Sequence, residues 1–246
     1  MMIFVAGASG QTGKLLVQQL LNHGDSVKIV VRDRNSLPST IKNHSKVHII
    51  QANILDLSNN DLSKEVRGCD AIASCLGHNM SIKGLFGHPR QLVTDATRKL
   101  CNAVKENKPE KPTKFVLMNT AGKRNADINE KISLGQKIVV GLLRLLLPPH
   151  ADNEKAADFL RTKIGQNNKD IEWVVVRPDN LINEEKVGKY NIYPSPIRSA
   201  IFNAGITSRI NVGHFMAELI TSNLWEKWKG QMPVIYNQNS VQNSNQ

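Results

Sequence analysis

The chain has 246 residues, of which 40% are hydrophobic, and this suits one large α/β domain rather than a disordered chain. Its net charge of +11 comes from scattered lysines and arginines, and only 5% of the residues are aromatic, so no nucleic-acid partner is expected. The three cysteines lack CxxC spacing, which argues against a disulfide framework and a metal site.

Apolar strands alternate with helical periodicity along most of the chain, which is typical of βαβ units around a parallel sheet. The strands are predicted at residues 2–6, 27–31, 46–50, 71–76, 115–119, 171–176 and 233–236. The helices are predicted at 11–23, at 89–107 with Pro89 in the first turn, at 151–166 and at 214–223. This spacing predicts a Rossmann-type doubly wound parallel sheet with a ligand crevice at the carboxyl ends of the strands.

Residues 1–236 are expected to form a single domain with this Rossmann-type sheet. Loops at 77–90, 122–149 and 179–210 are predicted to shape the substrate side. The tail at 237–246 is almost all Asn, Gln and Ser, and we expect it to be disordered. No apolar run is long enough to span a membrane, and the first residues form a strand-like run instead of a signal peptide, so we expect a cytoplasmic protein.

A glycine-rich segment directly follows the first predicted strand and opens the first helix. It reads Gly7-Ala8-Ser9-Gly10-Gln11-Thr12-Gly13. In a dinucleotide-binding loop the first glycine permits a tight turn, the second lets the backbone approach the pyrophosphate, and the third lets the helix pack against the sheet. Backbone N–H groups at the helix start then bind the phosphates. The alternative is a purely structural turn, but the position at the start of a βαβ series favours dinucleotide binding.

The end of the second strand predicts which dinucleotide is bound. An acidic side chain there binds the 2′-hydroxyl of NAD, whereas an arginine accommodates the 2′-phosphate of NADP. Arg32 occupies this place and Arg34 adds a second cation, which favours NADP(H), while selection of NAD by Asp33 is the alternative. Further cofactor contacts are predicted after the third and fourth strands, at Asn53 and Ile54, where adenine usually rests, and at Leu76 and Gly77.

Short-chain dehydrogenases usually carry a serine or threonine after the fifth strand and a Tyr-x-x-x-Lys pair on the next helix. Thr120 and Lys155 fit two of these positions, but Ala151 stands where the tyrosine would be. Without that proton carrier, a conjugated ring that accepts hydride directly is a more suitable substrate than an alcohol. His150 can donate a proton or position such a ring, or it simply begins a helix. Lys155 is either a contact to the nicotinamide ribose or a surface lysine.

The chain resembles the atypical short-chain dehydrogenase/reductase group that contains NmrA-like proteins and biliverdin-IXβ reductase (flavin reductase). The resemblance extends over most of the chain and rests on residues 7–13, 31–33, 47–54, 68–77, 150–155 and 212–216. Members of the group reduce flavins or linear tetrapyrroles with NADPH, so the resemblance implies an NADPH-dependent reductase.

The chain departs from the group in two places. Asn53 replaces the usual acidic residue at the adenine position, and residues 122–149 are extra sequence with an apolar stretch at 138–147. This insertion is interpreted as a helix that covers the core, a substrate lid, a homodimer face or a membrane-surface helix. The segment 77–81, with Lys83 and Phe86 beyond it, is predicted to line the pocket beside the nicotinamide.

The leading hypothesis is an NADPH-dependent oxidoreductase that reduces a planar conjugated small molecule such as a flavin, a quinone or a tetrapyrrole, with Thr120 and His150 orienting the acceptor. The alternative is an NmrA-like redox sensor that binds the dinucleotide without turning it over. Isomerase or epimerase chemistry on a sugar nucleotide is disfavoured, because it usually requires the same tyrosine.

Overall fold

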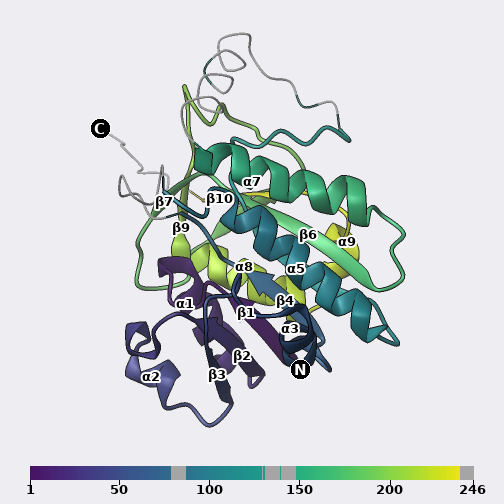
Figure 1. Ribbon diagram of the computed structural model, residues 1–246. Coiled ribbons are helices and arrows are strands. Elements are labelled where there is room, and N and C mark those ends of the chain that lie inside the picture. Colours follow the sequence, from purple (N-terminus) through teal and green to yellow (C-terminus); the bar gives the residue numbers. More distant parts are fainter. Residues whose placement is uncertain (79–86, 129, 131–138, 140–147, 239–246) are drawn as a thin grey trace.

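The computed structural model describes residues 1–78, 87–128, 130, 139 and 148–238 (Figure 1). Most of the apolar stretch at 138–147, most of the segment 77–86 and the tail from 239 onward lie outside the described residues, so the expectations for them stay predictions. Among the described residues, no helix has the length and apolar character needed to cross a membrane.

An eight-stranded sheet forms the centre of the fold, in the order β3-β2-β1-β4-β5-β6-β10-β8. All neighbours pair in parallel except β10 and β8. The strands are β1 (Met2–Ala6), β2 (Ser26–Val31), β3 (Val47–Gln51), β4 (Ala71–Ser74), β5 (Thr113–Met118), β6 (Ile171–Pro178), β8 (Tyr190–Tyr193) and β10 (Val234–Asn237). The predicted Rossmann-type doubly wound architecture is therefore confirmed, with the direction of winding reversing between β1 and β4.

Helices cover both faces of this sheet (Figure 1). On one face, α1 (Gln11–Asn22) packs against α8 (Arg209–Thr221). On the other face, α5 (Leu92–Asn107) lies between α3 (Asn59–Val66) and α7 (Pro148–Phe159). The shorter helices are α2 (Ser39–Lys42), α9 (Leu224–Trp228), the 3₁₀ turn η1 (Arg34–Ser36) and the π-helical turn η2 (Leu160–Ile164), which continues α7.

The apolar run of strand β1 is explained by its position in the middle of the sheet, where helices cover both faces. Ile3 and Val5 belong to the core on the α1 side, whereas Phe4 and Ala6 belong to the core on the α5 side. Successive side chains of a strand point to opposite faces, so a strand covered on both faces buries every residue.

Several boundaries differ from those predicted. Pro89 does not open a helix, and α5 begins at Leu92 instead. The first N–H groups of α5 donate hydrogen bonds to Asp152 of α7, which fixes this start. Helix α8 begins at Arg209 rather than at 214, since the Ser208 hydroxyl accepts a hydrogen bond from Asn211 N at 3.3 Å. Asn237, expected in the disordered tail, ends strand β10.

Several elements were not predicted, namely α2, α3, α9, η1 and the short strands of the loop expected at 179–210. Helix α3 begins after Ser58, whose hydroxyl accepts a hydrogen bond from Asp61 N, a cap that the Ser-x-x-Asp spacing indicates. The loop expected at 179–210 contains β8 and a two-stranded parallel sheet of β7 (Asn180–Ile182) and β9 (Ile206–Ser208). These strands are too short to show a period in the sequence.

Candidate dinucleotide-binding and active site

A cleft of about 170 Å³ lies at the carboxyl ends of β1, β2, β3 and β4, where the winding reverses. This is the place where doubly wound sheets bind ligands. Predicted cofactor residues from all four strand ends line it, namely Gly7, Ser9, Gly10, Arg32, Asn53, Ile54, Leu76 and Gly77. Gln11, Thr12, Gly13 and Arg34 lie outside its lining. The structure thus brings together segments that are far apart in the sequence.

Two glycines allow the backbone to close around this cleft. Gly7 has a φ of +81°, and a Cβ atom there would lie 2.7 Å from the carbonyl carbon of Cys75. A Cβ atom on Gly13 would lie 2.0 Å from the Gly7 carbonyl oxygen. Neither position has room for a side chain, because the obstacle in each case is backbone.

The start of α1 fits a phosphate group. Its N-cap is Gly10, no side chain caps the helix, and its first turn contains no acidic residue. The first N–H groups of a helix lack intrahelical acceptors and carry a partial positive charge. An uncapped glycine-rich start therefore leaves these groups available to an anion.

The two candidate ribose-reading residues differ in their surroundings. Arg32 is exposed, lines the cleft and makes no hydrogen bond or ion pair with any residue of the described chain. The Asp33 carboxylate instead accepts a hydrogen bond from Asn35 N at 2.8 Å and caps η1. Arg34 is exposed within η1. The arginine at position 32 is thus available to a ligand, whereas the aspartate is occupied by its own turn.

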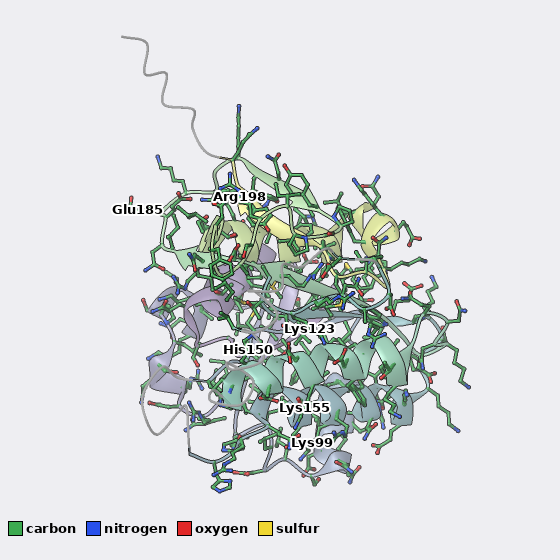
Figure 2. All side chains as sticks on the ribbon, turned by 90° about the horizontal axis from the view of Figure 1, so that it is seen from above. Lys99, Lys123, His150, Lys155, Glu185 and Arg198 are labelled. Carbon is green, nitrogen blue, oxygen red and sulfur yellow. The ribbon has the colours of Figure 1, made fainter. Side chains whose placement is uncertain are left out.

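The loop after β3 is fixed from a distant helix. The Lys99 ammonium of α5 donates hydrogen bonds to the carbonyl oxygens of Leu55, at 2.7 Å, and of Leu57 (Figure 2). Asn53 Nδ2 donates to Asp56 Oδ2 at 3.1 Å, and its Oδ1 accepts from Leu55 N at 3.3 Å. Sequence reasoning missed Lys99, because a lysine in an amphipathic helix gives no sign of the loop it contacts.

Thr120 and His150 converge on Gly122. A Cβ atom on Gly122 would lie 3.5 Å from His150 Nε2 and 3.7 Å from Thr120 Oγ1. Gly122 N donates to Thr120 Oγ1 at 3.2 Å, and His150 Nδ1 lies 3.9 Å from Glu154 Oε1. The third predicted catalytic residue, Lys155, is exposed on α7 (Figure 2). The structure therefore brings the hydroxyl and the imidazole together but leaves the lysine side chain largely in solvent.

Comparison with known proteins places this arrangement in a family. Residues 7–223 match the profile of the NAD(P)H-binding family, and this matched region covers most of the chain. The chain belongs to the NAD(P)H-binding family. This membership confirms the resemblance to the atypical short-chain dehydrogenase/reductase group, and the dinucleotide-binding segment identified from the glycines lies inside the matched region.

Individual relatives of this NAD(P)H-binding protein are distant. An uncharacterized chloroplastic protein of Arabidopsis thaliana is 28% identical over 192 residues, which is 78% of this chain but 63% of that protein. A short-chain dehydrogenase/reductase of Veillonella parvula, solved in complex with NADP, aligns with a TM-score of 0.69 and 15% identity over 97% of this chain and 95% of that one.

A candidate NADH-flavin reductase of Streptococcus pneumoniae aligns with a TM-score of 0.65 and 19% identity over 97% of this chain and 100% of that one. At such identities, the two solved structures show a shared fold.

A buried carboxylate joins three elements beside the site. Asp152 is fully buried on α7, and its oxygens accept hydrogen bonds from Val93 N at 2.8 Å and Thr94 N at 3.0 Å. His78 Nε2 lies 2.8 Å from the same carboxylate, and the His78 side chain is 6% exposed. Asp152 therefore joins the start of α5, helix α7 and the segment after Gly77. Sequence reasoning missed this pair.

Two ion pairs hold the described beginning of the insertion. Lys123 is 6% exposed, and its Nζ lies 2.7 Å from Asp158 Oδ2 (Figure 2). Arg177, fully buried at the end of β6, pairs with Glu130 at 2.8 Å and donates a hydrogen bond to the Lys123 carbonyl at 2.8 Å. Buried charges are retained when they are paired in this way. Lys123 and Glu130 are thus packed into the domain.

The cysteines have the properties of buried thiols. Burial raises the pKa of Cys75 to about 12 and that of Cys69 to about 11, and it also raises the pKa of Cys101. Thiols of such high pKa are poor nucleophiles at neutral pH. Cys75 lines the cleft, but its side chain packs against the core on the α1 side, with Sγ 3.9 Å from Met216 Sδ. Within the described residues, no group of three or more His, Cys, Asp and Glu is placed to hold a metal ion.

Proposed function

We propose that this protein is an NADPH-dependent reductase of a planar conjugated small molecule. The observation that carries the proposal is the convergence of Thr120 Oγ1 and His150 Nε2 beside Gly122. Thr120 follows the carboxyl end of β5, and the candidate dinucleotide cleft lies at the carboxyl ends of β1 to β4. Bound NADPH would supply the hydride, and the chain would position the acceptor and manage its proton.

The preference for NADPH rests on Arg32. A guanidinium without a protein partner is suited to a phosphate, which it binds through charge-assisted hydrogen bonds. Asp33 is the residue that would select NADH, but its carboxylate accepts a hydrogen bond from Asn35 N. The family membership supports dinucleotide binding in general, and Arg32 supplies the reason to prefer the phosphorylated form.

The chemistry proposed for the acceptor follows from the two converging groups. The Thr120 hydroxyl accepts a hydrogen bond from Gly122 N and can donate its own proton to an acceptor atom. His150 offers Nε2 as a second donor. Because Ala151 replaces the tyrosine of the alcohol dehydrogenases, a ring that needs only orientation and one proton suits the site better than an alcohol.

The second candidate function is a redox sensor that binds NADPH without turnover. Two observations favour it, namely the alanine at position 151 and the exposure of Lys155. A sensor needs the cleft but not the Thr120–His150 pair, so the two functions predict different effects of changing that pair.

The test measures NADPH oxidation by its absorbance, with FMN, a quinone and biliverdin as acceptors, alongside calorimetric titration of NADPH. We expect turnover with at least one acceptor. His150→Gln should lower kcat by about a hundredfold with unchanged NADPH affinity. The matched control His48→Gln changes a histidine whose side chain is 63% exposed on β3 and should have no effect. Tight NADPH binding without any turnover would favour the sensor.

A further inference from the structure

A second hollow, of about 180 Å³, lies beyond the carboxyl end of β10. Its lining comes from β8, from β10 and from the chain between β8 and the first residue of β9, and it includes Tyr193, Ile197, Arg198, Gly205, Ile206 and Tyr236. Like the cofactor cleft, it lies on the carboxyl side of the parallel strands, because β10 pairs in parallel with β6.

The inner wall of the hollow is aromatic. The rings of Tyr193 and Tyr236 have centroids 6.0 Å apart and are tilted by 55°. A Cβ atom on Gly205 would lie 2.2 Å from Tyr236 Cδ1, so a glycine is needed there for the ring to occupy its place. On the rim, Ile197 is 57% exposed and Ile206 is 46% exposed. Such walls suit the apolar part of a ligand.

Two hydrogen-bond donors, Tyr236 and Arg198, line the hollow beside the amide side chains of Asn191, Asn237 and Gln238. Tyr236 is 5% exposed, and its hydroxyl is buried with no hydrogen-bond acceptor among the described residues. Burial raises the pKa of Tyr236 to about 12, so its hydroxyl stays protonated at neutral pH. Arg198, labelled in Figure 2, is exposed and lines the hollow, and it forms no ion pair or hydrogen bond within the described chain. A buried donor without an acceptor carries a free-energy cost that a ligand oxygen can relieve.

One nearby carboxylate limits the positive charge of the hollow. Asp179 accepts a hydrogen bond from Gly205 N at 2.8 Å but does not line the hollow. Burial raises the pKa of Asp179, and the Arg198 charge opposes that rise. The Arg198 guanidinium is the cation that lines the hollow, and the buried Tyr236 hydroxyl belongs to a residue of its wall, so we expect anion binding of moderate rather than high affinity.

A packing contact links the hollow to the candidate catalytic groups. Ala121, the residue after Thr120, packs in one buried cluster with Tyr236 and Val234, and Tyr193 lies against this cluster. The wall of the hollow is therefore adjacent to the chain segment that carries the Thr120 hydroxyl.

We propose that this hollow binds a phosphate or carboxylate group carried by the acceptor, with Arg198 and Tyr236 as its donors. The inference rests on the proposed reductase function and narrows it, because it identifies the acceptor as a conjugated ring with an anionic side chain. Arginine has only donors and binds phosphate and carboxylate oxygens in pairs, which matches this chemistry.

FMN and riboflavin test the proposal, because they share one ring and differ by a phosphate. With NADPH saturating, the wild-type protein should show a KM for FMN about tenfold below that for riboflavin. Arg198→Gln and Tyr236→Phe should each remove most of this difference by raising the KM for FMN, with kcat and the riboflavin KM nearly unchanged. Lys186→Gln removes an exposed charge from the same region and should preserve the difference.

Equal KM values for the two flavins in the wild type, or a preference that survives Arg198→Gln, would overturn the proposal. If neither flavin is reduced, the reductase function fails for flavins, and binding decides the inference separately. Flavin fluorescence is then titrated with the NADP⁺-saturated protein. Tighter binding of FMN than of riboflavin, lost in Arg198→Gln but not in Lys186→Gln, supports the anion site, whereas equal or absent binding refutes it.

Discussion

At the residue scale, the candidate dinucleotide cleft depends on glycines at which an added Cβ atom would collide with backbone. Gly13 has no room for a Cβ atom, since the Gly7 carbonyl oxygen would lie 2.0 Å away. Gly10 is different, because it has an ordinary φ of −71° and a Cβ atom there would lie 3.2 Å from the same oxygen. A substitution at Gly10 should therefore affect ligand binding alone, whereas one at Gly13 should also affect folding.

Gly10→Val is expected to abolish NADPH binding while the fold survives, because the side chain would stand in the cleft that Gly10 lines. Gly13→Ala should lose binding and also destabilise the fold by about 2 kcal/mol or more, as overpacking against backbone does. Calorimetry and urea unfolding measure the two effects. Gly188→Ala meets no atom closer than 3.8 Å and serves as the control. Normal NADPH affinity in Gly10→Val would refute our placement of the pyrophosphate.

Arg32→Ala should weaken NADPH binding by about tenfold or more while changing NADH binding little, because only NADPH carries the phosphate that the guanidinium would contact. Arg34→Ala should have a smaller effect, since Arg34 does not line the cleft. Titration of both variants with both dinucleotides gives the comparison. Equal losses for NADPH and NADH in Arg32→Ala would show that Arg32 does not read the 2′-phosphate.

At the element scale, the start of α5 depends on a side chain from another helix. The side chain of the N-cap residue, Gln91, does not cap the helix. Asp152 of α7 instead accepts hydrogen bonds from two of the first N–H groups of α5. The same carboxylate contacts His78 after β4. One residue thus fixes the relative positions of two helices and a loop beside the site.

Asp152→Ala is predicted to lower the free energy of unfolding by about 3 kcal/mol, because it leaves two buried N–H groups and the His78 ring without their acceptor. Urea denaturation measures this change. Asp95→Ala removes a carboxylate from the first turn of α5 that is 42% exposed, and we expect a change within about 0.5 kcal/mol. Similar small losses in both variants would contradict the proposed role of Asp152.

At the scale of the whole molecule, the sheet order brings strand ends together that are distant along the chain. The cleft combines segments after β1, β2, β3 and β4, and the candidate acceptor side adds those after β5 and β10. A ligand in the cleft therefore contacts several elements of the folded state at once. Homodimer formation and a cytoplasmic location remain predictions at this scale.

Because only the folded chain has this cleft, NADPH should raise the free energy of unfolding. At a concentration one hundred times its dissociation constant, the increase should be about 2.7 kcal/mol. NADH at the same concentration should stabilise less, and the Gly10→Val variant should show no stabilisation by either. Thermal unfolding with and without each dinucleotide measures this. Equal stabilisation by both dinucleotides would argue against NADPH selectivity.

Much of this architecture follows from local sequence patterns. Apolar runs predicted the strands β1 to β6 and β10, and the glycines at 7, 10 and 13 predicted the loop between β1 and α1. Periodicity and turn stereochemistry act between residues that are close in the sequence, so they can be recognised without the fold. Arg32 could be singled out in the same way, because its place is defined by the end of β2.

Contacts between distant segments were decided by tertiary structure alone. His78 and Asp152 are 74 residues apart, and Lys99 is 44 residues from the carbonyl it holds at Leu55. Tyr236 and Arg198 share a hollow only because β10 pairs with β8. The sequence by itself determined the Rossmann-type fold and the glycine-rich loop between β1 and α1. Tertiary structure decided which buried polar groups are paired and which remain available to a ligand, because that depends on which segments the folded sheet brings together.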